Sequence, residues 1–187
     1  MLSVRPYILS DREQVEQICL QNAGCSDAKE ETKKLVLLIY CTYYLENECE
    51  NCFVAVDDDG KVVGYILCCE NYNTYEKVFL EKYIPQAAMI SARRYVDAKF
   101  SMLKYGMYRK EYPAHFYINV ALEHQNSGIG GLLISTMKAH LRKKYVKGVM
   151  LVCDADNAEL IGFFEKNGFN SLITTRFGRA MAMPFDK

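Results

Sequence analysis

Residues 125–131 form a glycine-containing loop, Gln-Asn-Ser-Gly-Ile-Gly-Gly, between two segments of different periodicity. Residues 115–122 before it are β-type, and apolar residues after it recur at helical spacing from Ile129 to Tyr145. Glycines in such a loop let the backbone turn tightly and let a ligand approach the main chain. The first N–H groups of the following helix are unpaired and lie at the positive end of its dipole. The segment therefore predicts a strand, a loop and a helix, with a site for a pyrophosphate group at the loop.

Two better-known phosphate loops do not fit this segment. A Walker loop would continue with Gly-Lys-Ser or Gly-Lys-Thr, and no such sequence follows here. The dinucleotide fingerprint needs Gly-x-Gly-x-x-Gly, whereas the spacing here is Gly-x-Gly-Gly. The glycines alone are equally compatible with a flexible turn that opens a helix, because short glycine motifs often occur without a ligand.

The rest of the chain predicts a mixed α/β fold in a single domain that spans residues 1–187. Ser10 and Glu13 have the spacing of a capping box at the start of a helix, and Gly148 is expected to stop the helix that begins at the glycine loop. The turn 57–60, Asp-Asp-Asp-Gly, predicts a hairpin. Strands are expected at 4–9, 52–56, 62–67, 115–122, 149–153, 171–175 and 180–183, and further helices at 27–45 and 157–166.

Residues 72–112 have a different character, rich in tyrosine and methionine, and are interpreted as a helical insertion. Pro85 is the one proline inside this segment before Tyr112. Because proline disfavours helix in the residue before it, two helical pieces separated near Ile84 or Pro85 are expected.

Composition narrows the class of protein further. Lys plus Arg and Asp plus Glu both count 23, so no overall field favours nucleic acid or an anionic membrane, and neither partner is expected. The N-terminus lacks the pattern of a signal peptide, and the apolar run 35–45 is shorter than the roughly 20 residues that span a bilayer. A cytoplasmic location and eight free thiols are therefore expected. Cys49 and Cys52 have metal-ligand spacing but no second pair follows, so no metal is expected.

A second motif follows the loop, Asn157-Ala-Glu-Leu-Ile-Gly-Phe-Phe-Glu-Lys-Asn-Gly-Phe169. Together with Gln-x-x-Gly-x-Gly after an apolar strand, it resembles the two signatures of the GNAT superfamily of acyl-CoA N-acyltransferases, in the same order and at the right separation. The run 113–119, Pro-Ala-His-Phe-Tyr-Ile-Asn, is similar to the branch that includes bacterial acetyltransferases and the acetyltransferase-like domain of O-GlcNAcases. The resemblance is clear over 113–170 and looser at the ends. It implies a twisted, mostly antiparallel sheet of about six or seven strands with one splayed parallel pair, flanked by helices.

The resemblance also implies acetyl-CoA as co-substrate. Backbone groups at the end of the strand would pair with the pantetheine arm, amides of the loop would hold the pyrophosphate, and Asn157 would contact the cofactor near its sulfur while capping a helix. The implied cofactor-binding residues are Val120, Ala121, Leu122, Gln125, Asn126, Ser127, Gly128, Ile129, Gly130, Gly131, Asn157 and Phe164.

The catalytic residues are less well marked. An amine acceptor must lose a proton before it attacks, and His115 lies at the offset where relatives place a base. The competing interpretation is a structural histidine at the start of a strand. Asn119 stands where close relatives carry Asp, and Phe164 stands where the superfamily usually has a tyrosine that protonates the leaving thiolate. Losing such an acid would cost on the order of 10² to 10⁴ in rate if that step were limiting.

The sequence thus favours an N-acetyltransferase that acts on a primary amine of a small molecule or protein. The alternative is a non-catalytic module that binds coenzyme A, and a more remote one is a structural α/β domain with a chance glycine loop. The acceptor pocket is expected between 10–25, the insertion and the hairpin near 176–179, with Tyr95, Tyr105 and Tyr108 as candidate lining residues and Arg93 and Arg94 as weaker ones. The oligomeric state stays open, with a homodimer as one option.

Overall fold

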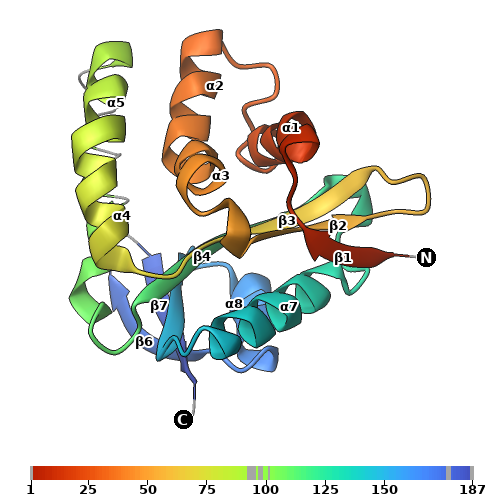
Figure 1. Cartoon of the computed structure of the whole chain (residues 1–187), viewed down its shortest axis with the longest axis vertical. Coiled ribbons are helices and arrows are strands. Elements are labelled where there is room, and N and C mark those ends of the chain that lie inside the picture. The colour runs from red at the N-terminus through yellow and green to blue at the C-terminus, as the bar shows by residue number, and fades with distance from the viewer. Residues whose placement is uncertain (1, 92–95, 97–98, 101, 176–177, 186–187) are drawn as a thin grey trace.

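The computed structural model describes residues 2–91, 96, 99, 100, 102–175 and 178–185, and a twisted sheet forms its centre (Figure 1). The sheet has seven strands in the order β1-β2-β3-β4-β5-β7-β6. Adjacent strands are antiparallel except β4 and β5, which are parallel. The strands are β1 Ser3–Pro6, β2 Cys52–Val56, β3 Val62–Cys69, β4 Ala114–Val120, β5 Gly148–Cys153, β6 Asn170–Thr175 and β7 Gly178–Pro184. The expected mixed sheet with one parallel pair is confirmed.

Helices cover both faces of this sheet (Figure 1). One face carries α1 Arg12–Asn22, α2 Glu30–Leu37, α3 Tyr43–Asn47, α4 Tyr72–Val78 and α5 Ile84–Ile90, and the other carries α7 Ile129–Lys143 and α8 Ala158–Lys166. Alternate residues of each strand serve the two layers, because successive side chains of a strand point to opposite faces. In β4, Tyr117 packs with the layer of α1 to α5, whereas Phe116 and Ile118 pack with the layer of α7 and α8.

The first helix begins later than the capping-box pattern predicted. α1 starts at Arg12 with Asp11 before it, and Ser10 lies in a short 3-10 turn, Leu9–Asp11. The buried Asp11 carboxylate accepts the Ile8 N–H at 2.9 Å and both Arg5 guanidinium nitrogens at 2.7 Å. Those charged bonds hold the pKa of Asp11 below its ordinary value although burial opposes the shift. The carboxylate of Asp11 therefore organises this turn instead of the Ser10 hydroxyl.

The insertion does not break at Pro85 as expected. α4 passes through a π-helical turn, Phe79–Tyr83, directly into α5, and the two form one rod in Figure 1. Pro85 lies in the first turn of α5, where its missing N–H costs least. The wider turn before it accommodates the proline within a continuous helical path.

The end of α7 also differs from expectation. The helix ends at Lys143, and Tyr145 then adopts a left-handed conformation with φ of 58°. Gly148 does not stop the helix; it begins β5. A Cβ at Gly148 would lie 2.9 Å from the Met183 carbonyl oxygen and 2.8 Å from the Tyr112 ring, so close strand packing explains this glycine.

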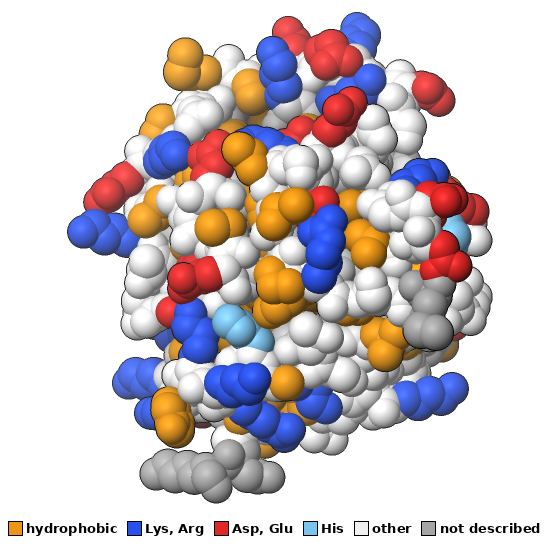
Figure 2. Space-filling view, turned by 45° about the vertical axis from the view of Figure 1, so that its right-hand side comes forward, with side chains coloured by type: hydrophobic (Ala, Val, Ile, Leu, Met, Phe, Trp, Pro, Cys, Tyr) orange, Lys and Arg blue, Asp and Glu red, His pale blue; other side chains and the backbone are white. Residues whose placement is uncertain are grey.

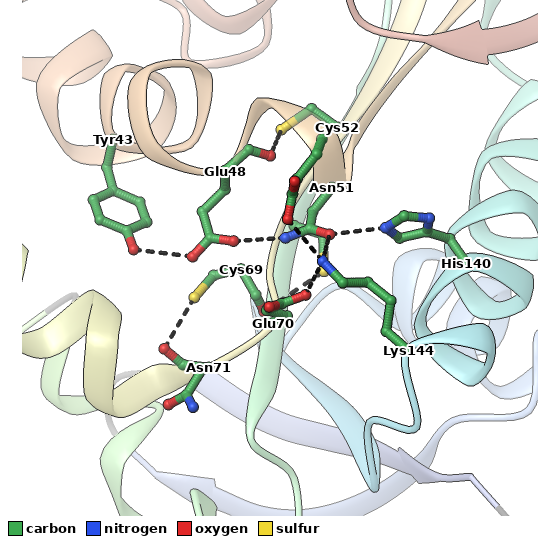
Figure 3. A network of polar contacts seen from close by, with 11 residues as sticks. Tyr43, Glu48, Asn51, Cys52, Cys69, Glu70, Asn71, His140 and Lys144 are labelled. Carbon is green, nitrogen blue, oxygen red and sulfur yellow. Dashed lines mark hydrogen bonds and ion pairs between the residues drawn. The ribbon is translucent and has the colours of Figure 1, made fainter.

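A buried polar network fixes the C-terminal half of α7 to the start of β2 (Figure 3). Asn51 is 1% exposed; its amide nitrogen donates to Glu48 Oε2 at 2.6 Å, and its oxygen accepts from His140 Nε2 at 2.8 Å and from Lys144 Nζ at 3.0 Å. Lys144 also pairs with Glu50 and with Glu70. Burial raises the pKa of the Glu48 carboxyl above its ordinary value. The network anchors the helix whose other end meets the glycine loop.

Candidate functional site

A groove of about 750 Å³ opens where β4 and β5 separate. The two strands pair only at Ala114 with Val149 and at His115 with Met150, and the register ends there. The residues that line the groove come from α1, β4, the glycine loop, β5 and α8: Asn22, Phe116, Tyr117, Ile118, Asn119, Val120, His124, Gln125, Asn126, Ser127, Gly128, Ile129, Gly130, Leu151, Val152, Cys153, Asn157, Glu159, Leu160, Phe163 and Phe164. The splayed parallel pair and the loop thus meet in one cavity.

Backbone groups of β4 face this gap. In an antiparallel ladder, alternate residues point their N–H and C=O groups to the same neighbour. The Ala121 N–H donates to the Val63 oxygen of β3 at 2.9 Å, and Tyr65 lies opposite Asn119. The N–H and C=O groups of Val120 and Ile118 therefore point away from β3, toward the opening. An extended polar molecule could pair with them as another strand would.

The glycine loop has the geometry of an anion-binding turn. Gly128 has φ of 84° and Asn126 has φ of 60°, both in the left-handed region, and α7 begins at Ile129. The Ser127 hydroxyl donates to the His124 carbonyl oxygen and so closes the turn. N–H groups of the first turn of α7 stand at the groove, where the helix dipole favours a negative group.

The three glycines of the loop have different structural roles. A Cβ at Gly128 would meet nothing within 4 Å, so this residue is needed for its backbone conformation and leaves open space above it. A Cβ at Gly130 would lie 2.8 Å from the Phe163 ring, so this glycine allows α7 and α8 to pack closely. A Cβ at Gly131 would make only an ordinary contact with Asn167, at 3.7 Å.

Most of the residues that the motifs implied lie together in the groove. Ala121, Leu122 and Gly131 are the members of the implied set outside its lining. Asn157 caps α8, since its Oδ1 accepts the Leu160 N–H at 2.9 Å, and it also lines the groove. Phe164 lines it too, 3% exposed, with its ring edge-on to Phe116 and Phe169. Their contacts with a cofactor remain predictions.

His115 lies outside the groove. It is fully buried on the α1 to α5 face, stacked on Tyr105 with ring centroids 4.3 Å apart, and its Nε2 is 2.9 Å from the Tyr44 hydroxyl. Nδ1 has no hydrogen-bond partner among the described residues. Desolvation lowers the pKa of His115 to about 3. A base must reach the proton that it removes, so this placement argues against the expected base role and for a structural one.

Sequence reasoning did not single out several residues of the groove, among them Asn22 and Tyr117. Asn22 ends α1; its Nδ2 donates to the Ile18 oxygen at 2.9 Å and to the Val120 oxygen at 3.1 Å, and its Oδ1 accepts from Gln125 Nε2 at 3.4 Å. Tyr117 lies two positions after His115 on the same face of β4, which period-two alternation could have indicated. No local pattern points to Asn22, because its partners are about a hundred residues away.

The expected acceptor residues have mixed outcomes. Tyr105 is 2% exposed and belongs to the core, and Tyr108 packs half-buried against it. Tyr95, Arg93, Arg94 and the start of the hairpin at Arg176 lie outside the described residues. Among the residues described, no group of three or more His, Cys, Asp or Glu side chains is placed to hold a metal ion.

Comparison with known families shows which family this chain belongs to. A model of the acetyltransferase (GNAT) family matches residues 21–169, which is most of the chain. The chain belongs to the GNAT acetyltransferase family. None of the curated proteins matches this sequence. The splayed strands, the glycine loop and the α8 motif described above all lie within or at the end of the matched segment.

Solved structures show that the fold of this GNAT protein is shared. SsHAT is 22% identical with a TM-score of 0.85, over 100% of this chain and 99% of that one. The PaiA N-acetyltransferase of Thermoplasma acidophilum, in complex with coenzyme A, is 15% identical with a TM-score of 0.62, over 99% of each chain. The ribosomal-protein-S18-alanine N-acetyltransferase of Escherichia coli is 16% identical with a TM-score of 0.54, over 100% and 96%. At these identities the likeness establishes the fold alone.

The surface of this GNAT protein is mixed in charge. On the face in Figure 2, acidic and basic side chains both occur, and lysines and arginines gather toward the lower part, where α7 and α8 lie in Figure 1. His140, Arg142 and Lys143 occupy the last turn of α7, where cations complement the helix dipole. In the described part of the chain, no helix is both long and apolar enough to cross a membrane.

Proposed function

We propose that this protein transfers the acetyl group of acetyl-CoA to a primary amine, by direct attack of the amine in a ternary complex. The observation that carries the proposal is the groove where β4 and β5 part, which runs into the N-terminus of α7. It offers an extended molecule two kinds of site: strand-edge backbone groups along its length, where the Val120 oxygen already accepts from Asn22, and helix N–H groups at its end. A thioester on a pantetheine arm with a pyrophosphate at its far end matches both.

The residues present fit coenzyme A. A phosphate group would lie in the open space at Gly128, and the N–H groups of the first turn of α7 would supply donors and a positive potential. The gap-facing groups of Ile118 and Val120 would pair with the amides of the pantetheine arm. Among the described lining residues there is no lysine or arginine, so backbone groups would bind the phosphates.

Direct attack is favoured because the one cysteine in the described lining is a poor nucleophile. Cys153 is 9% exposed, and burial raises the pKa of its thiol. Its Sγ donates to the Arg179 oxygen at 3.7 Å. Since the thiolate is the reactive form, an acetyl-cysteine intermediate is disfavoured at neutral pH.

A non-catalytic module that binds coenzyme A is the second candidate function. It is favoured by Phe164, which has no hydroxyl to protonate the leaving thiolate, and by the burial of His115. Neither observation affects the loop or the strand edges, so both candidates predict binding of the cofactor. They differ only in whether free thiol is released when an amine is added.

Calorimetric titration with acetyl-CoA tests the shared part of both candidates. The informative variant is Ser127→Glu, which places a negative charge in the loop, and its matched control is Ser135→Glu, the same change on the exposed side of α7. Micromolar binding that Ser127→Glu weakens at least tenfold and Ser135→Glu leaves unchanged would support the site. Glycine variants are less suitable, because a side chain at Gly130 would push against Phe163. Absence of binding by the unmodified protein would refute the proposal.

A further inference from the structure

The acceptor side of the groove carries no charge in the described part of the chain. Asn22, Tyr117, Asn119 and Val152 line it on the face of α1 to α5. The one carboxylate among the described lining residues, that of Glu159, is exposed on α8, two residues from the Asn157 cap and on the opposite face of the sheet. On this side, the described part of the cavity therefore offers an amine an aromatic ring and amides instead of an ion-pair partner.

This lining has a chemical consequence for the acceptor. An alkyl ammonium group has a pKa of about 10.4, so at pH 7 it must be deprotonated before its nitrogen can attack. On the α1 to α5 face of the groove, no described group is suited to remove that proton, since His115 is sequestered among tyrosines and Asn119 is an amide. The one histidine among the described lining residues, His124, lies in the turn that leads into the glycine loop, at the end of the groove where the phosphates would bind. An amine conjugated to an aromatic ring is a much weaker base. Its nitrogen is therefore unprotonated at pH 7, and no general base is needed to expose the lone pair.

Two side chains match such an acceptor in shape. Tyr117 lines the groove half-buried, and its ring is held edge-on by Tyr40 at 5.2 Å and by Tyr44 at 5.6 Å between centroids. A fixed aromatic surface suits a planar ring. Asn119 donates from Nδ2 to the Tyr65 hydroxyl at 2.6 Å, which leaves Oδ1 to accept from an N–H of the acceptor.

We propose that the acceptor is an aromatic amine, held with its ring against Tyr117 and its amino group near Asn119. The inference rests on the proposed transferase function. The nitrogen lone pair attacks the thioester carbonyl carbon, a C–N bond forms, and the C–S bond breaks with its electron pair on sulfur. The proton lost from nitrogen neutralises the released thiolate, so the step needs no further reactant.

Aniline and cyclohexylamine form a matched pair of probes, similar in size and different in basicity. With the full chain and saturating acetyl-CoA at pH 7, thiol release after subtraction of the uncatalysed rate should give a kcat/KM at least tenfold higher for aniline. Equal or faster reaction of cyclohexylamine, or of a lysine peptide, would overturn the inference and leave the transferase function standing. If the unmodified protein did not bind acetyl-CoA in calorimetry, the transferase function itself would be refuted.

Asn119→Asp tests the cause of the preference. The Tyr65 hydroxyl can donate to the new carboxylate, so the bond is kept with its direction reversed. A carboxylate here should shift the aniline to cyclohexylamine ratio at least tenfold toward cyclohexylamine, whereas Asn170→Asp, the same change on exposed β6, should not. An unchanged ratio would overturn the inference. If Asn119→Asp does not fold, Tyr117→Leu serves as the second test. This variant should lower kcat/KM for aniline without changing the affinity for acetyl-CoA, and an unchanged kcat/KM would count against the inference.

Discussion

At the scale of single residues, Asn22 joins three parts of the groove that are far apart in sequence. Its amide bonds the end of α1 to the gap-facing carbonyl of Val120 and to the side chain of Gln125. We expect Asn22→Ala to raise the dissociation constant for acetyl-CoA by roughly three- to tenfold, because each lost hydrogen bond is worth about 0.5–1.5 kcal/mol. Titration calorimetry measures this, with Gln17→Ala on the exposed side of α1 as control. Equal affinities of the two variants would show that Asn22 does not position the loop.

Phe164 offers a second test at this scale. Phe164→Tyr restores a hydroxyl at the position where the superfamily usually carries one. A positioned acid contributes on the order of 10²-fold or more to the rate. If departure of the thiolate limits the reaction, the kcat of Phe164→Tyr should exceed that of the unmodified protein by a factor approaching this value, while the affinity for acetyl-CoA stays the same. Steady-state kinetics distinguishes the two quantities. An unchanged kcat would mean that the thiolate leaves unprotonated.

The conformation of the glycine loop was predictable because it depends on local sequence. Gly128 with its positive φ and Asn157 with its cap geometry are determined by neighbours in sequence. The burial of His115 was not predictable, because its offset along β4 was considered without the tyrosines that enclose it. Those tyrosines come from α3 and from the insertion, which includes α4, and no local signal places them around β4.

At the scale of elements, the contact between α7 and α8 predicts different effects of substitution at two adjacent glycines, Gly130 and Gly131. Gly130→Ala should destabilise the protein, because its Cβ would come within 2.8 Å of the Phe163 ring. Gly131→Ala should be neutral or stabilising by up to about 1 kcal/mol, since alanine favours helix and the nearest atom is 3.7 Å away. Urea unfolding of both variants gives the comparison. Equal effects would mean that Phe163 moves aside without cost.

The network at the far end of α7 gives another matched pair (Figure 3). Asn51→Ala should lower the free energy of unfolding by about 2–4 kcal/mol, because it leaves the buried Glu48 carboxyl and His140 without their shared partner. Glu50→Ala removes an exposed partner of the same Lys144 and should cost under about 1 kcal/mol. Chemical denaturation measures both, and a small loss in Asn51→Ala would show that water replaces the amide.

Element types were easier to predict than element ends. Strong periodicity located α7 and β5, but α7 ends at Lys143 because Tyr145 adopts the left-handed conformation before Gly148 is reached. Helix also continues across Pro85 because a π turn absorbs it. In both places a tertiary contact or an irregular turn overrides the local preference that the sequence displays.

At the scale of the whole molecule, burial of His115 makes stability depend on pH. Its pKa is about 3 in the folded state and about 6.5 in an unfolded chain, so between these values the unfolded state binds more protons. The free energy of unfolding should therefore fall as pH drops from 6.5 toward 3 and be independent of this group above 6.5. Each tenfold difference in proton affinity between the two states changes the free energy of unfolding by up to about 1.4 kcal/mol.

His115→Phe should make that decline shallower, since the residue no longer titrates. Urea unfolding between pH 7.5 and 4 measures the slope. Tyr44→Phe is the control, because it removes the hydroxyl bonded to Nε2 and keeps the imidazole, so its curve should be displaced with the slope retained. Parallel curves for the unmodified protein and His115→Phe would contradict the linkage.

The short seam between β4 and β5 changes how the whole sheet should be regarded. Two residue pairs join a group of four strands, β1 to β4, to a group of three, β5 to β7. Beyond these pairs, each group ends at the seam in an edge that has no neighbouring strand among the described residues, and such edges invite pairing with any extended chain. A pantetheine arm lying there would take the place of a strand between β4 and β5. Saturation with the cofactor would then complete the sheet and protect its open edges from association with other molecules.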